Sequence, residues 1–306
     1  MLNRRILRIK AFKAVYSYAE NPGMTLRDTE ALLEHSLEAT RDLYVYMLSI
    51  IGSLTAEASA RIEAARSKFN PTEEERNPNM KFVRNRVSAL LESDPDFQKA
   101  VKNRKLSWDQ CDVLLRNLYE KLRGREYFRK YMESGEDSVA EDAALWMRIF
   151  EREFEDNDDL WQILEDMDIL WTDDLPYALI ACCNTLRSIG AGARWSLPEL
   201  YLSDMPGQEG KDSDKQFVFC LLRKAYARYA DYFQAVSELT PKWDKNRLCV
   251  TDLALIACGL AENEAFPSIP AKVIINEYVE ISKYYSTPES RAFVNGLLDK
   301  LINKNQ

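Results

Sequence analysis

The sequence predicts an all-α protein, and three observations indicate this fold class. The chain has 10 glycines in 306 residues, which is about half the usual share. Residues 26–69 keep helical periodicity with one glycine and no proline, as a long helix requires. Two segments near the C-terminus each start at a proline and carry one apolar stripe. No run of about 18 apolar residues occurs, so the sequence predicts no transmembrane helix.

The first predicted helix covers residues 3–18 and has a basic face. No acidic residue precedes Glu20, so exposed positive charge is expected on this helix. Two interpretations are open: a solvated helix flank, or a site for single-stranded RNA, whose phosphates bind guanidinium groups and whose bases stack on aromatic rings. The basic side chains of this face and the aromatic side chains beside it are Arg4, Arg5, Arg8, Phe12 and Tyr16.

The central part of the chain separates its charges by segment. After the long helix, Asn–Pro pairs at 70–71 and 77–78 are typical of a loop. Residues 76–130 then contain 14 basic and 7 acidic side chains, whereas residues 131–175 contain 2 basic and 16 acidic ones. The acidic segment also contains many large apolar residues, which argues against a disordered tail. It is therefore predicted to form an amphipathic helix pair. Its large apolar residues are Trp146, Phe150, Phe154, Trp161, Ile163, Ile169 and Leu170.

Two explanations of this charge pattern are open. In the first, the basic residues pair with the acidic segment inside the protein. In the second, the basic segment lengthens an RNA-binding track, and the acidic segment keeps other polyanions from the remaining surface. The basic residues concerned include Lys81, Arg84, Arg86, Lys99, Lys102, Arg104, Arg123, Arg125 and Arg129.

The C-terminal part begins with a polar loop and ends with two well-marked helices. Residues 203–215 (SDMPGQEGKDSDK) are typical of a loop. Pro270 is expected to open one helix. Thr287 and Pro288 are expected to be the N-cap and the first residue of the other. The apolar stripes are Ile274, Tyr278, Ile281 and Tyr285 in one helix, and Phe293, Val294, Leu297, Leu298 and Leu301 in the other.

These two helices also contain polar residues that packing does not require. The sequences are PAKVIINE over 270–277 and SRAFVNGLLDK over 290–300. Together they resemble the signature of the NusB family of transcription antitermination factors. The arginine-rich first helix is similar to the first helix of that family, and residues 217–243 are similar to a later one. The following helix matches loosely, because Leu253 follows Asp252 where the family usually has arginine.

The resemblance implies an all-α protein with a NusB-like pair of helical bundles and an additional helical insertion. Members of the family are ordinarily much shorter than this chain. The implied domains are residues 1–70 with the N-terminal NusB-like helices, residues 71–212 with the insertion, and residues 213–306 with the C-terminal NusB-like bundle. The segment Ala178–Cys182 also repeats as Ala254–Cys258, so the insertion resembles a degenerate copy of the C-terminal half, in which Trp171 parallels Trp243.

The resemblance further implies an RNA-binding transcription antitermination factor. Family members bind boxA-type RNA of ribosomal RNA leaders with a NusE-type small-subunit ribosomal protein, and the pair acts on RNA polymerase. Phe293 is equally expected to belong to the core, Gly296 to allow close helix packing, and Asn276 and Glu277 to brace neighbouring helices. The implied RNA-binding residues are Arg4, Arg5, Arg8, Tyr16, Arg291, Phe293 and Asn295.

The sequence offers little for catalysis. His35 is the only histidine, and no glycine pattern of a nucleotide-binding loop is present. The six cysteines lack CxxC spacing and are expected to be reduced core residues. We therefore expect a cytoplasmic protein that is not an enzyme and has no cofactor, metal site or membrane partner. Two alternatives are a protein-binding helical scaffold and an RNA-binding module like that of rRNA cytosine methyltransferases, without their catalysis.

Overall fold

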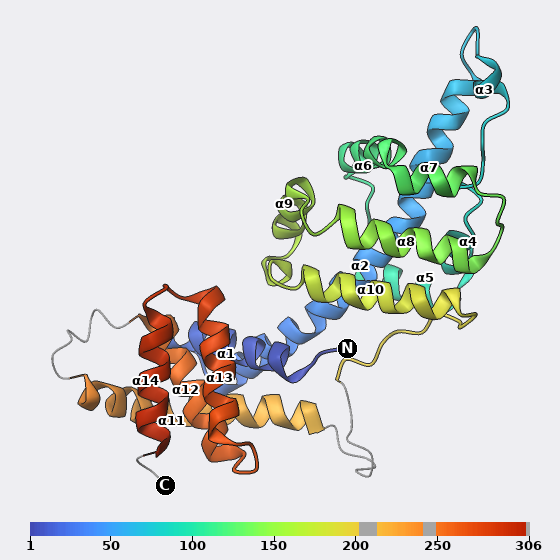
Figure 1. Cartoon of the computed structure of the whole chain (residues 1–306). Coiled ribbons are helices and arrows are strands. Elements are labelled where there is room, and N and C mark those ends of the chain that lie inside the picture. Colours follow the sequence, from blue (N-terminus) through green and yellow to red (C-terminus); the bar gives the residue numbers. More distant parts are fainter. Residues whose placement is uncertain (202–212, 241–248, 304–306) are drawn as a thin grey trace. The chain divides into compact units, whose positions relative to one another are not determined.

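The all-α prediction is confirmed by the computed structural model, which describes residues 1–201, 213–240 and 249–303. These residues form fourteen α-helices, one 3-10 turn and an isolated bridge between Leu2 and Tyr201, with no strand. The chain divides into two compact units (Figure 1). We call them the terminal unit, which comprises Met1–Leu37 and Glu199–Gln306, and the central unit, which comprises Glu38–Pro198.

The terminal unit is built around helix α12 (Val250–Ala265). Every residue of α12 from Asp252 to Glu262 is buried, as expected for a helix that is covered on all sides. Gly259 of α12 has a specific packing role, because a Cβ there would lie 2.7 Å from Cδ2 of Leu298. The surrounding helices are α1 (Arg4–Glu20), α11 (Ser213–Leu239), α13 (Ala271–Tyr285) and α14 (Ser290–Asn303).

In the terminal unit a local cap starts α1, whereas the start of α14 differs from its prediction. Asn3 caps α1 by accepting a hydrogen bond from the Ile6 amide. The last helix begins at Ser290 and not at Pro288, because residues 287–289 form a turn. The Ser290 hydroxyl donates to the buried carboxylate of Asp252, at 2.7 Å. A tertiary contact with α12, absent from the local sequence, therefore holds this turn.

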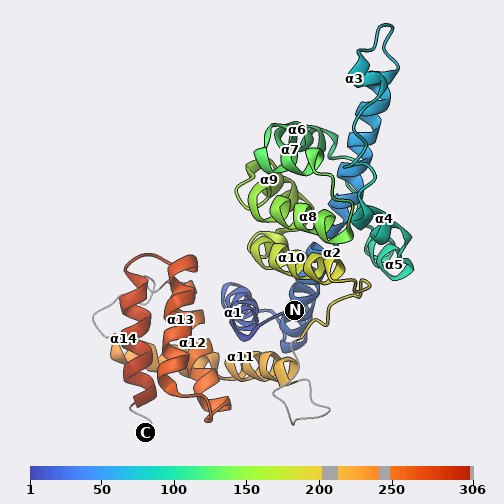
Figure 2. The ribbon, with the colours of Figure 1, turned by 45° about the vertical axis from the view of Figure 1, so that its right-hand side comes forward.

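The central unit packs short helices along the remainder of α2 (Leu26–Arg66), whose first part belongs to the terminal unit. Tyr46 of α2 stacks on Trp108 with ring centroids 4.0 Å apart, and the Trp108 indole N–H donates to the Tyr46 carbonyl. Helices α8 and α10 lie side by side (Figure 2). The further elements are α3 (Glu73–Arg76), α4 (Arg86–Ser93), α5 (Pro95–Arg104), α6 (Asp112–Gly124), α7 (Glu126–Glu133), α8 (Val139–Glu153), α9 (Asp158–Met167), the 3-10 turn Ile169–Trp171 and α10 (Leu175–Gly190).

The acidic segment forms the predicted helix pair, α8 and α9, with Trp146 and Phe150 in the core. Basic residues of segment 76–130 pair with it, which supports the first explanation of the charge pattern. The ion pairs are Lys81–Glu141 at 2.8 Å, Arg86–Asp137 at 2.7 Å, Lys121–Glu153 at 3.0 Å and Arg125–Glu153 at 2.8 Å. Arg104 instead pairs with Asp42.

The predicted domain boundaries at residues 70 and 212 concern resemblance to the family and stay a prediction. The compact units instead change at Leu37/Glu38 and Pro198/Glu199. The two copies of the suggested repeat lie in α10 and α12, and Cys182 and Cys258 are both buried there. Trp243 lies outside the described residues.

One sequence-based expectation needs correction. Cys220 and Cys249 are exposed, so only four of the six cysteines are core residues. Among the described helices, α2 is the one that is long and apolar enough to cross a membrane by length and composition. However, 61% of its most apolar 18-residue stretch is buried, and the core helix of a soluble protein meets the same criterion. It is therefore weak support for a membrane span.

Candidate nucleic-acid interface

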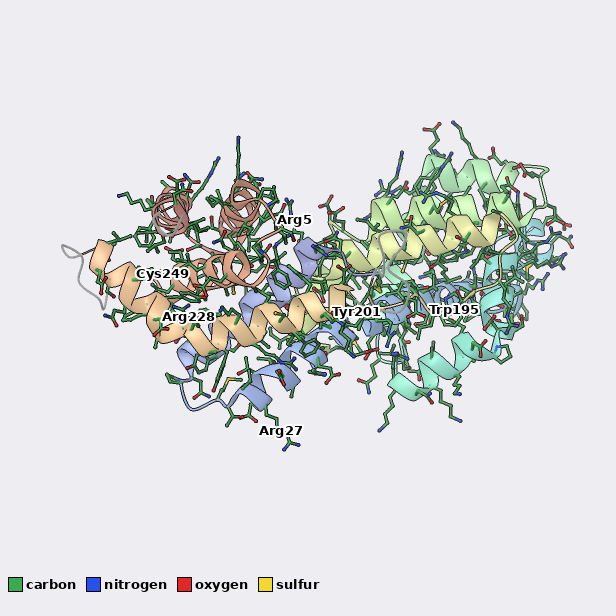
Figure 3. The ribbon with its side chains drawn as sticks, turned by 90° about the horizontal axis from the view of Figure 1, so that it is seen from below. Arg5, Arg27, Trp195, Tyr201, Arg228 and Cys249 are labelled. Carbon is green, nitrogen blue, oxygen red and sulfur yellow. The ribbon has the colours of Figure 1, made fainter. Side chains whose placement is uncertain are left out.

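The three arginines of α1 differ in exposure and in partners. The side chains of Arg4 and Arg5 are 45% and 48% exposed. The Arg4 Nε–H donates to Asp214 of α11 at 3.1 Å. Arg5, labelled in Figure 3, donates its Nε–H and an Nη2–H to the two oxygens of Glu277 of α13, at 3.0 and 2.8 Å. Both side chains therefore combine solvent exposure with a fixed carboxylate partner.

Arg8 is only 6% exposed, so the expectation of an exposed charge at this position is wrong. Its Nε–H and Nη2–H donate to Glu262 of α12 at 2.9 and 2.6 Å, and the Tyr278 hydroxyl donates to the same carboxylate at 2.9 Å. Burial alone would lower the pKa of Arg8, but the hydrogen bonds and charge of Glu262 raise it. A buried carboxylate requires such partners, so Arg8 connects α1 to α12.

An aromatic cluster continues along the same side of α1. The Phe12 ring lies 5.5 Å from that of Tyr285 and 6.4 Å from that of Tyr16. Lys13 Nζ lies 5.4 Å from the centroid of Tyr285. Tyr16 is exposed, and it stands three turns after Arg5, roughly 16 Å along the helix axis.

We call this region the arginine–tyrosine surface. It is defined by Arg5, Lys13, Tyr16 and Tyr285, with Arg4 at its N-terminal edge. Arg5 of α1 contacts Glu277 of α13, and Phe12, further along α1, contacts Tyr285, further along α13. The two helices therefore run in the same direction. Their side chains therefore form one basic and aromatic strip.

The other predicted site residues lie on α14, which packs mainly against α12 and α13. Arg291 and Asn295 are exposed, and Phe293 is half-buried, outside the core formed by its neighbours. Gly296 has no heavy atom within 4 Å of an added Cβ, so its predicted role in close helix packing is wrong. Gly259 has that role instead. The terminal unit thus has a second exposed polar strip on α14.

Sequence reasoning did not identify the acidic partners of the arginines or the contribution of Tyr285. The α13 helix also carries two polar residues outside its apolar stripe. Asn276 is exposed, and Glu277 braces α1 through Arg5, as expected for a structural role. A signal for Glu262 existed, because this carboxylate directly follows the apolar run of residues 253–261 in α12. Its partner stands 254 residues away, so periodicity alone does not reveal the pair.

The structure offers no assembled metal site within the ranges that it describes. There, no group of three or more His, Cys, Asp or Glu side chains is placed to hold an ion. His35 is an exposed residue of α2.

Comparisons with known proteins agree with the resemblance in the C-terminal helices. The model of the NusB family matches residues 194–303, which include α11 to α14. The chain is 31% identical over 106 residues to the transcription antitermination protein NusB of Thermoanaerobacter sp., covering 35% of this chain and 71% of that protein. It is 36% identical over 89 residues to that of Agathobacter rectalis, covering 29% of this chain and 68% of that protein.

A third relative shows a shorter overlap. The protein of the same name from Chloroherpeton thalassium is 31% identical over 112 residues, which cover 37% of this chain and 50% of that protein. No solved structure matches the chain. Helix α1 and most of the central unit lie outside the residues that the family model matches.

Proposed function

The chain belongs to the NusB family, and on that premise we propose that it is an RNA-binding transcription antitermination factor. In this proposal it binds boxA-type RNA of ribosomal RNA leaders together with a NusE-type ribosomal protein, and the complex acts on RNA polymerase. The protein acts in the cytoplasm and carries out no catalytic step. The relatives that it resembles bear the name transcription antitermination protein.

The observation that supports RNA binding most is the arginine–tyrosine surface. Arg4 and Arg5 are half-exposed at one end, and Tyr16 is exposed at the other. Guanidinium groups bind phosphates, and exposed aromatic rings stack on unpaired bases. Lys13 and Tyr285 lie between the two ends. A single RNA strand that follows α1 would therefore meet phosphate-binding and base-stacking groups in succession.

The carboxylates beside the arginines affect how strongly this surface binds. Glu277 holds the plane of the Arg5 guanidinium with two hydrogen bonds. The hydrogen bond from Arg5 lowers the pKa of Glu277, against the effect of burial, so the pair stays charged at neutral pH. A pre-oriented guanidinium loses less conformational freedom on binding, but its charge is partly neutralised. We therefore expect weak RNA binding by the chain alone and tighter binding when a protein partner adds contacts.

We assign Arg291, Phe293 and Asn295 of α14 to a second set of RNA contacts. Arg291 and Asn295 are exposed and have hydrogen-bonding groups suited to phosphates and base edges. The adjacent Gly296 leaves open space at its Cα, where a ligand can approach the backbone. In contrast, we assign Arg8 to holding α1 in place, because it is buried against Glu262.

A titration with boxA-like and scrambled RNA across a range of salt concentrations tests this function. The wild-type chain should prefer the boxA-like RNA. Substituting both Arg4→Gln and Arg5→Gln should weaken binding and flatten the slope of log K against log salt by about 1.4, since each phosphate contact on a single strand contributes about 0.7.

The matched control replaces two exposed arginines of α2, Arg27→Gln and Arg66→Gln, and removes the same charge. Arg27 points away from the ribbon in Figure 3. The control should keep the wild-type slope. Equal binding of both RNAs by the wild type would contradict the proposed specificity, and an unchanged slope in the α1 variant would remove α1 from the RNA site.

A further inference from the structure

The central unit carries a second concentration of positive charge, between α7 and α8. Segment 131–175 contains 16 acidic residues and two basic ones, Arg148 and Arg152. Both arginines are exposed on α8, and their spacing of four residues places them on the same side of the helix. The two cations of this acidic segment therefore lie together.

Arg148 and Arg152 face further cations across a hollow of about 640 Å³. Arg125 and Lys130, at the start of α7 and within it, line the opposite side. Two carboxylates, Glu126 and Glu153, complete the charged lining. Four cations against two anions leave the hollow with an excess of positive charge.

Glu153 is already satisfied by other groups. Its side chain is fully buried and accepts hydrogen bonds from Arg125 at 2.8 and 2.9 Å and from the Tyr127 hydroxyl at 2.9 Å. Lys121 Nζ lies 3.0 Å from the same carboxylate. Burial alone would raise the pKa of Glu153, but these hydrogen bonds lower it. The Glu153 carboxylate thus holds Lys121 and Arg125, and it has no ion pair with Arg148 or Arg152.

The arginines of α8 have little to bind within the protein. Over residues 1–201, 213–240 and 249–303, no hydrogen bond or ion pair reaches Arg148, and the contact of Arg152 is with the Tyr127 ring, 5.7 Å from its centroid. Like charges held close together repel, and a bound anion relieves that repulsion. Guanidinium groups also bind phosphate through paired hydrogen bonds.

We infer that this hollow binds the phosphate backbone of RNA, an inference that rests on the proposed RNA-binding function. Tyr127 provides the aromatic ring in this lining. It is buried, and its hydroxyl donates a hydrogen bond to Glu153, so the ring is not free to stack on a base. The lining is otherwise charged, whereas a peptide partner usually requires an apolar centre. Phosphate contacts carry no sequence information, so the hollow adds affinity and no sequence preference.

The test compares two double variants of the full chain, Arg148→Gln/Arg152→Gln and Lys99→Gln/Lys102→Gln. The second is a matched control, because Lys99 and Lys102 are exposed on α5 of the same unit. Replacing them removes the same two positive charges. Each protein is titrated with a boxA-like RNA carrying flanking sequence and with a scrambled RNA of the same length, over a range of salt concentrations. Circular dichroism and thermal melting verify that both variants fold.

The α8 variant should lose affinity for both RNAs by the same factor, so the preference for boxA-like RNA is unchanged. Its slope of log K against log salt should flatten by about 1.4, which corresponds to two phosphate contacts. The α5 control should keep the wild-type slope. This result would support a backbone-binding site in the central unit.

Four results would overturn the inference. If the wild type binds RNA and the α8 variant keeps its affinity and slope, the hollow does not bind RNA, while the proposed function stands. An equal loss in both double variants would indicate a general charge effect. A loss of affinity confined to the boxA-like RNA would mean that the hollow recognises the RNA sequence and not only the phosphate backbone. If the wild type binds no RNA at all, the proposed function fails, and this inference fails with it.

Discussion

Arg5 and Arg8, one turn apart on α1, allow a test of how burial changes the contribution of an arginine to the free energy of unfolding. Arg8→Ala would leave Glu262 buried without its guanidinium partner, which typically costs about 3–5 kcal/mol. Arg5→Ala removes a half-exposed ion pair, which typically contributes less than about 1 kcal/mol. Urea unfolding followed by circular dichroism should show a much lower midpoint for the Arg8 variant. Equal midpoints for the two variants would contradict the buried position of Arg8.

The sequence predicted which face of α1 carries these arginines, but it did not predict their burial or their carboxylate partners. The helical periodicity of residues 3–18 placed Arg4, Arg5 and Arg8 on one basic face, but only Arg4 and Arg5 are exposed there. It could not separate the buried Arg8 from the exposed pair, because Glu262, Glu277 and Asp214 are distant in the chain. Exposure of a charged residue depends on tertiary partners, which periodicity does not contain.

Two glycines provide a matched test of residue packing. Gly259→Ala places a Cβ 2.7 Å from Cδ2 of Leu298 and should destabilise the protein by about 1–3 kcal/mol through overpacking. Gly296→Ala meets nothing within 4 Å and should stabilise it by about 0.5–1 kcal/mol, since alanine favours a helix. Thermal melting measures both changes.

Gly296→Ala also separates folding from function. If the space at Gly296 admits a ligand, the variant should bind RNA or its protein partner less well although it is more stable. A variant with higher stability and wild-type binding would remove Gly296 from the interface. Destabilisation by Gly296→Ala would contradict the open surroundings seen in α14.

At the scale of helices, Glu153 anchors α6 and α7 to α8. Its pKa is lower in the folded protein than the ordinary value, so it contributes stability above the ordinary carboxyl pKa and loses that contribution as pH falls through the lowered value. Glu153→Gln should therefore destabilise the protein at neutral pH, and the difference from wild type should shrink as the solution becomes acidic. Urea unfolding at a series of pH values measures this difference.

The control for this experiment is Glu126→Gln. The pKa of Glu126 is also lowered, first by its hydrogen bond with Lys130, but the pair is exposed, so its effect on stability should be small at every pH. A constant difference between wild type and Glu153→Gln across the whole pH range would show that the charge of Glu153 does not anchor these helices.

The boundaries of helices followed the sequence where capping is local and departed from it where tertiary contacts decide. The helix predicted over residues 3–18 corresponds to α1, which Asn3 caps, and the acidic helix pair followed from its apolar residues. The start of α14 was wrong by two residues, because the Ser290–Asp252 contact holds the preceding turn. The hollow between α7 and α8 was also not predicted, since it requires the relative placement of two helices.

At the scale of the whole molecule, the family signature identified the C-terminal helices and left the division of the chain open. Residues 194–303 match the NusB family model, in agreement with the motifs in α13 and α14. One of the two boundaries between the compact units, Leu37/Glu38, falls inside the continuous helix α2. A helix that belongs to two units has no local break, so turn signals in the sequence could not mark this position.

The most direct test of the central claim measures complex formation with RNA and a protein partner. A recombinant NusE-type small-subunit ribosomal protein from the same cell is mixed with this chain and analysed by gel filtration, and the mixture is then titrated with boxA-like and scrambled RNA. We expect one co-eluting complex that binds the boxA-like RNA more tightly than this chain alone, because adjacent sites on one strand combine their contacts. Two separate peaks at concentrations well above micromolar, together with equal binding of both RNAs, would contradict the antitermination role.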